Sequence, residues 1–272
     1  MPAGLERDFL FSQHSLGDFV ACPRRFYLRY VVRQAWPQLD GDPLAEQDYL
    51  ARGRLLHRWI ERDLLGIPTG AADAPAEGEL GVWWARYKAT DLSDLPTVRH
   101  PELALTAGVG AERVYARFDL LAIDASAAII IDWKTLRGQH PPGKAFFARR
   151  PQTRIYRYVL VAAGASYNGG RAIDPAQVSM RYWLANFPAQ PWVSVRYSDT
   201  DYAEDARWLQ ALLADVRGRD GEAGFEKTDD RRVCAHCPYR ALCGRGDALP
   251  QPADIRDDEA DPEDGPIEAL EY

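Results

Sequence analysis

The stretch IIIDWK, at residues 129–134, runs three consecutive β-branched residues directly into an Asp-x-Lys pattern. Such a run, bounded by turn residues, predicts a buried strand. Because residues two apart on a strand share a face, Asp132 and Lys134 should project together, with Trp133 pointing into the opposite layer. The stretch therefore predicts a carboxylate and an ammonium side by side at the end of a strand.

A second carboxylate is expected next to this pair. Residues 112–123 are also rich in strand-forming side chains, and DASA at 124–127 predicts a hairpin turn that brings Asp119 near Asp132. Two carboxylates on adjacent strands form a hard-oxygen pocket suited to Mg²⁺ or Mn²⁺. A nearby ammonium, Lys134, could then help a metal-bound water to attack a phosphate. A salt bridge between Lys134 and one aspartate explains the same residues, and both interpretations stay open at this point.

Periodicity and turn residues divide the rest of the chain into further elements. Ser15 is predicted to cap a helix that runs to about Val32. The other predicted helices cover 44–65, 79–89, 151–164 and 200–217, and the other predicted strands cover 177–184 and 191–197. This order predicts an α/β fold whose mixed central β-sheet is flanked by helices, rather than a regular doubly wound sheet.

The net charge of −7 first argues against a nucleic-acid partner. The charges are unevenly distributed, however, because residues 247–272 hold ten acids and one base and therefore carry −9. Residues 1–246 then carry +2. The Pro-rich 247–272 segment is predicted to be a disordered acidic tail, so the overall charge does not exclude DNA as a partner.

No segment of the sequence predicts a membrane protein. The longest uncharged apolar run, 159–165, is far shorter than the roughly 20 residues of a membrane-spanning helix. The first residues, MPAGLERDFLF, lack the basic and apolar regions of a secretory signal. We therefore expect a cytoplasmic protein without a membrane partner.

Several motifs together resemble the PD-(D/E)XK nuclease superfamily, and within it the RecB-like branch. They are Asp119, Asp132-x-Lys134, the helix pattern Gln152-Thr-Arg-Ile-Tyr156, and the upstream Gly53-Arg-Leu-Leu-His57. The resemblance implies a restriction-endonuclease-like core and a Mg²⁺ or Mn²⁺ ion held by His57, Asp119, Asp132 and the backbone carbonyl of Trp133. It also implies a catalytic role for Lys134, with Gln152 and Tyr156 contacting DNA or orienting the lysine. Glu102 is a weaker match to the glutamate that begins the family's sheet.

The four cysteines form a second motif. Cys234, Cys237 and Cys243 give a C-x2-C-x5-C pattern, and Cys22 lies far upstream before Pro-Arg-Arg-Phe-Tyr. Spacing alone fits a structural Zn²⁺ site, with His236 as a substitute ligand, or an iron–sulfur cluster. The joint pattern resembles iron–sulfur RecB-like nucleases, among them CRISPR-associated exonucleases and the nuclease domain of AddB. That resemblance implies a [4Fe–4S] cluster that clamps the two ends of the domain.

These observations predict one nuclease domain over 1–246 and the separate tail at 247–272. Within the domain we expect a helical part at about 12–90, a catalytic core at about 100–217 and the cysteine cluster at 234–243. The expected activity is metal-dependent hydrolysis of DNA by an exonuclease that acts on single-stranded DNA or on DNA ends, in repair, recombination or defence. The alternative is a catalytically weak DNA-binding or scaffold subunit of the same fold.

Expected partners follow from the same resemblance. The chain lacks the G-x-x-x-x-G-K-[ST] motif of a helicase, so a helicase or a CRISPR-type protein would be a separate partner. Basic side chains that could hold the DNA backbone are clustered in two regions, at Arg24 and Arg25 and at Arg149, Arg150 and Arg154. The alternative explanation of each cluster, without a function, is the solvent-exposed face of a helix.

Overall fold

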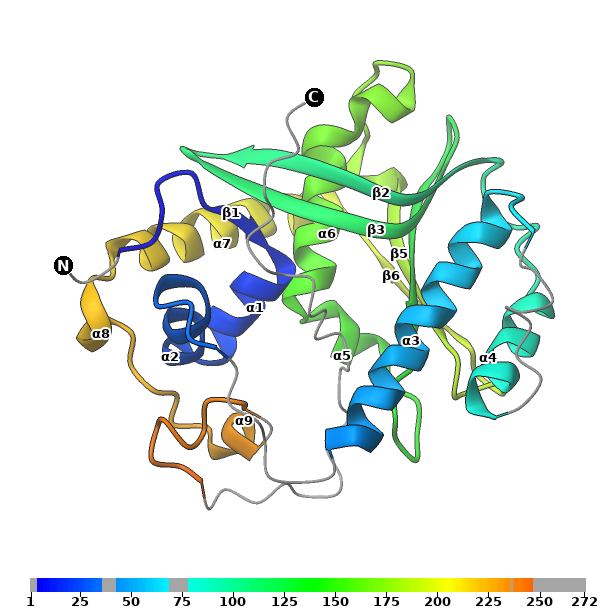
Figure 1. Cartoon of the computed structure of the whole chain (residues 1–272). Coiled ribbons are helices and arrows are strands. Elements are labelled where there is room, and N and C mark those ends of the chain that lie inside the picture. Colours follow the sequence, from blue (N-terminus) through cyan, green and yellow to red (C-terminus); the bar gives the residue numbers. More distant parts are fainter. Residues whose placement is uncertain (1–3, 36–42, 69–77, 236, 247–272) are drawn as a thin grey trace.

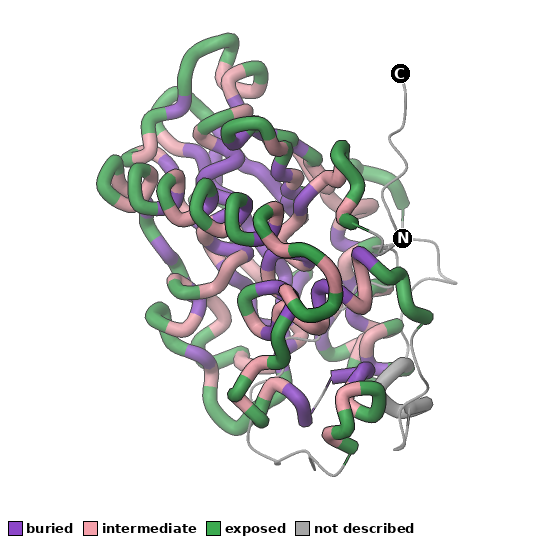
Figure 2. The backbone as a smooth tube through the Cα atoms, turned by 90° about the vertical axis from the view of Figure 1, so that its left-hand side faces the viewer, coloured by how far each residue is buried: buried purple, intermediate pink, exposed green. Residues whose placement is uncertain are grey.

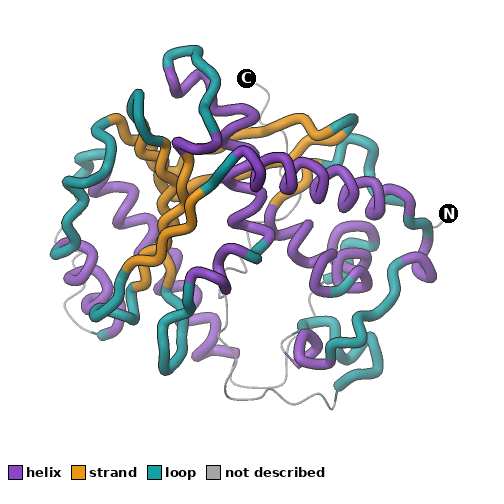
Figure 3. Tube along the Cα trace, turned by 180° about the vertical axis from the view of Figure 1, so that it is seen from behind, coloured by secondary structure: helices purple, strands orange, loops and turns teal. Residues whose placement is uncertain are grey.

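A computed structural model of the chain describes residues 4–35, 43–68, 78–235 and 237–246 (Figure 1). The predicted tail at 247–272 and the alternative ligand His236 lie outside these residues. The described chain contains a six-stranded mixed β-sheet with helices on both sides of the strands (Figure 3). The predicted fold class is therefore confirmed.

The sheet is organised around one long strand, β3, which pairs with three others. It is antiparallel to β2 along its whole length, parallel to β1 near its start and antiparallel to β4 near its end. Strand β5 then adds parallel to β4, and β6 adds antiparallel to β5. The strands are β1 Leu10–Ser12, β2 Val98–Val109, β3 Glu112–Ile123, β4 Ala128–Lys134, β5 Val178–Leu184 and β6 Trp192–Arg196.

Each face of the sheet packs against its own group of helices. The larger hydrophobic cluster holds α1 (Gln13–Ala21), α6 (Pro151–Ala163) and α7 (Asp199–Gly218). The other cluster holds α3 (Pro43–Leu64) and α4 (Glu79–Lys88). Buried backbone follows the strands between these layers (Figure 2). The shorter helices are α2 Pro23–Phe26, η1 Tyr27–Val31, α5 Lys144–Ala148, η2 Gly164–Asn168, η3 Pro175–Gln177, α8 Gly221–Gly224 and α9 Arg231–Ala235.

The predicted hairpin and most helix positions agree with the structure to within a residue or two. The prediction of one helix from Ser15 to Val32 is wrong. Helix α1 instead begins after Ser12, whose side chain and that of Ser15 form a reciprocal capping box. The helix ends at Cys22, which is extended (φ −163°, ψ 107°). Pro23 follows, and a residue before proline is disfavoured in the helical region, so the chain must break there.

Strands β1 and β2 were not expected from the sequence pattern.

Among the described helices, none combines the length and the apolar character needed to cross a membrane.

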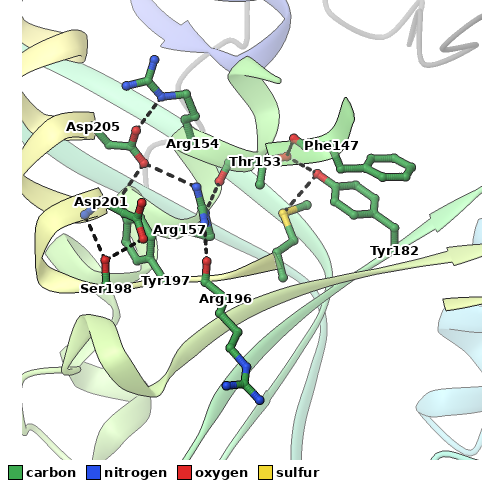
Figure 4. A network of polar contacts seen from close by, with 11 residues as sticks. Phe147, Thr153, Arg154, Arg157, Tyr182, Arg196, Tyr197, Ser198, Asp201 and Asp205 are labelled. Atoms are coloured by element: carbon green, nitrogen blue, oxygen red, sulfur yellow. Dashed lines mark hydrogen bonds and ion pairs between the residues drawn. The ribbon is translucent and has the colours of Figure 1, made fainter. Parts of the chain in front are cut away.

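A buried polar network joins α6 to α7 and to the residue after β6 (Figure 4). Asp205 on α7 accepts a hydrogen bond from Arg154 Nε at 2.5 Å and one from the Tyr197 hydroxyl at 3.0 Å. The Arg157 guanidinium, almost completely buried, lies 3.7 Å from the same carboxylate. Arg157 also donates to the Arg196 carbonyl at 2.8 Å. The network fixes α6, which carries Gln152 and Tyr156, on the sheet.

We expect Asp205→Ala to lower the free energy of unfolding by about 3–5 kcal/mol, because it leaves the buried Arg157 charge without its carboxylate. Asp215→Ala, on the same helix, removes an exposed i,i+4 pair with Arg219 and should cost less than about 1 kcal/mol. Urea unfolding followed by circular dichroism measures both. Equal effects of the two substitutions would contradict the stabilising role of the network.

Candidate active site

Four side chains form a row across the middle of the sheet. The β2–β3 pairs Pro101–Leu120 and Leu103–Phe118 place Glu102 opposite Asp119. The β3–β4 register, extended by one residue from the pair Leu120–Ile131, places Asp119 opposite Asp132. Asp132 is in turn the partner of Tyr182 on β5. Three carboxylates therefore occupy neighbouring positions on three adjacent strands, which is the arrangement that the hairpin prediction required for Asp119 and Asp132.

The sheet bends where this row crosses β2 and β3. Phe118 and Leu120 are two residues apart on β3, yet they pack into the two different hydrophobic clusters. A regular pleat would put both on one face, so the strand changes its orientation at Asp119. Opposite this point Glu102 has φ 49°, a conformation that non-glycine residues rarely adopt and that is found at functional sites.

The bend brings Asp119 to the His57 helix, α3. The Asp119 carboxylate lies 3.4 Å from His57 Nδ1 and accepts a hydrogen bond of 2.8 Å from the backbone N–H of Trp133. His57, Glu102 and Asp119 each offer a ligand atom, and these atoms all lie within 4.8 Å of one another. One imidazole and two carboxylates in this arrangement can hold a divalent cation.

Asp132 and Lys134 form an ion pair on the face of β4 that packs against α6. Lys134 Nζ lies 2.7 Å from Asp132 Oδ2, and both residues are at most 2% exposed. Gln152 of α6 donates to Asp132 Oδ1 at 2.7 Å. Trp133 points to the opposite layer and packs against Trp183 and Tyr87 there, as the strand alternation predicted.

Tyr156, one helical turn after Gln152, is buried and packs edge-on against the Phe118 ring at 5.2 Å between centroids. Tyr182 lies under the Lys134 ammonium, 5.7 Å from its ring centroid, and shares a 2.5 Å hydrogen bond with Thr153. Sequence reasoning missed Tyr182, because its place beside Asp132 depends on the parallel pairing of β4 with β5.

Burial and mutual repulsion perturb the carboxylates. Burial, with the charge of Asp119, raises the pKa of Glu102 to about 7 and the pKa of Asp132 to about 6. Burial also raises the pKa of Asp119, but His57 outweighs it and the net shift is downward. For His57, burial lowers the pKa, but the Asp119 carboxylate outweighs it and raises that pKa to about 9. The site thus concentrates negative charge that a cation would stabilise.

Comparisons with known proteins identify the family of the chain. Residues 10–244 match the family model described as the PD-(D/E)XK nuclease superfamily. The chain belongs to this superfamily. Similar solved structures include that of SSO0001, with 15% identity over 88% of this chain and 87% of that one and a TM-score of 0.40. Another is a provisionally named exonuclease from Eubacterium rectale, with 11% identity over 91% of both chains and a TM-score of 0.48. No curated protein matches the sequence.

The motif residues of this chain thus fall into two adjoining groups. The first joins His57 and Asp119 to Glu102, and the second joins Asp132 to Lys134 and Gln152. Coulombic coupling between Asp119 and Asp132 connects the two groups. The only sequence signal for Glu102 was its position in Pro101-Glu102-Leu103.

The four cysteines are free thiols, and three of them are buried. They come from distant parts of the sequence, because Cys22 precedes α2, Cys234 lies on α9, and Cys237 and Cys243 follow α9. Cys237 interacts electrostatically with Cys22 and Cys243, and burial raises its thiol pKa to about 11. The thiols that were grouped by sequence spacing therefore lie in one region of the molecule.

Most of the basic residues predicted to bind DNA have intramolecular partners. Arg24 contacts Glu222 and donates to the Phe225 carbonyl, Arg25 lies 2.7 Å from Asp18, and Arg154 binds Asp205. Arg149 is exposed. Arg150 is half-buried near the active site, where its charge acts on Lys134 and Asp132. Arg150 also lies over the Phe146 ring, so Arg149 is the most exposed of the five arginines.

Mg²⁺ binding should weaken as the pH falls from 8.5 to 6. His57 is protonated below about pH 9 and Glu102 below about pH 7, and a cation must displace both protons. The affinity should fall about tenfold per pH unit above pH 7, where one proton is released, and more steeply below it. Isothermal titration calorimetry at several pH values measures this. Glu102→Gln should weaken binding and remove the extra steepness below pH 7, and pH-independent affinity would contradict the assignment.

Proposed function

We propose that the protein is a Mg²⁺- or Mn²⁺-dependent deoxyribonuclease of the RecB-like branch, acting on single-stranded DNA or on DNA ends as an exonuclease. The observation that carries the proposal is the buried Asp132–Lys134 pair next to the cation-binding group of His57, Glu102 and Asp119. Membership of the PD-(D/E)XK superfamily supports the same reaction class. The four free thiols favour the cytoplasm, where cysteines stay reduced.

The donor set fits a hard divalent cation. We infer that it would be held by His57, Asp119, Asp132 and the backbone carbonyl of Trp133, and we add Glu102 to these ligands. When bound, the ion supplies Lewis-acid stabilisation of phosphate charge and a more acidic water. A cation would also offset the burial and the Asp119 charge that raise the pKa values of Glu102 and Asp132.

The chain's own residues prepare this site. The Trp133 N–H fixes the orientation of the Asp119 carboxylate, and Gln152 fixes that of Asp132. Lys134 holds its positive charge within reach of the same carboxylates, where it would offset charge developing on the phosphate. Tyr156 is buried against Phe118 and hydrogen-bonds with Gln152, so we infer that it supports Gln152 rather than exposing its ring to DNA.

The four thiols lie in one region of the molecule, as ligands of a shared metal centre must. An iron–sulfur cluster takes four cysteine ligands, including one that is distant in sequence. We therefore propose a [4Fe–4S] cluster held by Cys22, Cys234, Cys237 and Cys243, which would join the ends of the domain and resist unfolding.

The biological setting we propose is DNA repair, recombination or defence, with a helicase or a CRISPR-type protein as a partner. A scaffold subunit of the same fold is the alternative, and a cleavage assay distinguishes the two.

We expect the wild-type protein to cleave single-stranded DNA with Mn²⁺, and Asp119→Asn and Lys134→Met each to lower the rate by at least about 100-fold. The control Asp215→Asn changes an exposed carboxylate on α7 and should leave the rate unchanged. Linear and circular strands, compared at equal concentration, identify a requirement for ends. A wild-type preparation that binds DNA but cleaves no better than either variant would instead support the scaffold role.

The cluster proposal makes a separate prediction. Wild-type protein purified without oxygen should contain about four iron and four sulfide per chain and absorb visible light. Cys22→Ser should lose most of the iron and unfold at lower denaturant concentration, because it breaks the link between the two ends. Zinc in place of iron and sulfide would refute the cluster.

A further inference from the structure

Arg245 and Thr228 direct hydrogen-bond donors at two of the cysteine sulfurs, and Lys227 donates to a cysteine carbonyl. Arg245 Nη1 donates to Cys234 Sγ at 3.1 Å and to the Thr228 carbonyl at 2.5 Å. The Thr228 backbone N–H points to Cys22 Sγ at 3.5 Å. Lys227 Nζ donates to the Cys243 carbonyl at 2.8 Å. One short segment thus links the guanidinium to the cysteines of both chain ends.

Arg245 differs from the other donors because its charge is permanent. Its guanidinium interacts electrostatically with Cys22 and Cys243 as well as with Cys234. The neighbouring Arg240 provides a natural comparison, because it donates to the Ala235 carbonyl at 2.9 Å. Arg245 therefore contacts a sulfur, whereas Arg240, in the same segment, contacts a backbone oxygen.

We propose that Arg245 is a positioning residue of the cysteine site, which holds the Cys234 sulfur on the iron–sulfur cluster and raises the cluster's reduction potential. The inference rests on the proposed cluster. A cation beside a ligand sulfur stabilises the reduced cluster more than the oxidised one, because reduction adds negative charge. Hydrogen bonds to the sulfurs are among the factors that set the potential of such clusters. The same contact opposes dissociation of the Cys234 ligand.

The test uses the full-length protein purified without oxygen as wild type, Arg245→Gln, Arg245→Lys and Arg240→Gln. Iron and sulfide are counted in each, the midpoint potential is measured by dye-mediated titration, and iron loss to a chelator is timed. Arg245→Gln should shift the reduction equilibrium at least about tenfold toward the oxidised form, which is about 59 mV for one electron. It should also lose iron several times faster. Arg245→Lys, which keeps the charge, should fall between, and Arg240→Gln should match wild type.

The outcomes separate this inference from the proposal beneath it. Wild-type protein without iron and sulfide overturns the cluster and, with it, the role of Arg245. A wild-type cluster with equal potential and equal iron loss in Arg245→Gln and Arg240→Gln overturns the role of Arg245 alone. If Arg245→Gln is isolated without iron, thermal melting of the metal-free variants decides. If metal-free Arg245→Gln melts at the same temperature as metal-free Arg240→Gln, the role at the cluster is supported. If Arg245→Gln alone has lost the folded state, that role is overturned.

Discussion

Asp132 and Lys134 are two opposite charges held out of water at the end of β4, and the surrounding structure is arranged to make that possible. Burying an ion pair costs several kcal/mol per ion unless close geometry and further hydrogen bonds compensate. Here the separation is 2.7 Å, and Gln152 donates to the second carboxylate oxygen. Helix α6 must therefore lie where Gln152 can reach Asp132, so its position depends on the Asp132–Lys134 ion pair. A fold that needed only stability would do as well with apolar residues at these positions, so the pair indicates function.

The candidate site adjoins this pair through the bend at Glu102 and Asp119. The bend carries Asp119 from its strand neighbours toward His57, and the unusual φ of Glu102 is part of the same distortion. Strain of this kind costs free energy, so the packed layers on both sides must hold it. At the other end of the domain, Arg24 and Thr228 connect the first helices to the last segment. Both sites thus combine residues that are distant in sequence but fixed by one core.

Strand alternation explains why the core of the site could be predicted from sequence. A period of two puts Asp132 and Lys134 on one face and Trp133 on the other whatever the rest of the fold does. The break at Cys22 follows from Pro23, but the helix start depends on which of two nearby serines lies at the cap. The sequence pattern did not place Glu102, because a positive φ and a bend leave no periodic signal. The partners of Arg24 and Arg154 were also inaccessible, since Glu222 and Asp205 become neighbours only after folding.

We infer that the carboxylates around the Asp132–Lys134 pair form a divalent-cation site. Anomalous X-ray diffraction from crystals grown with Mn²⁺ locates the bound ion. We expect a manganese peak within ligand distance of His57 and Asp119, and its loss in crystals of Asp119→Asn. Crystals that bind manganese only elsewhere, with His57 and Asp119 still paired to each other, would contradict it.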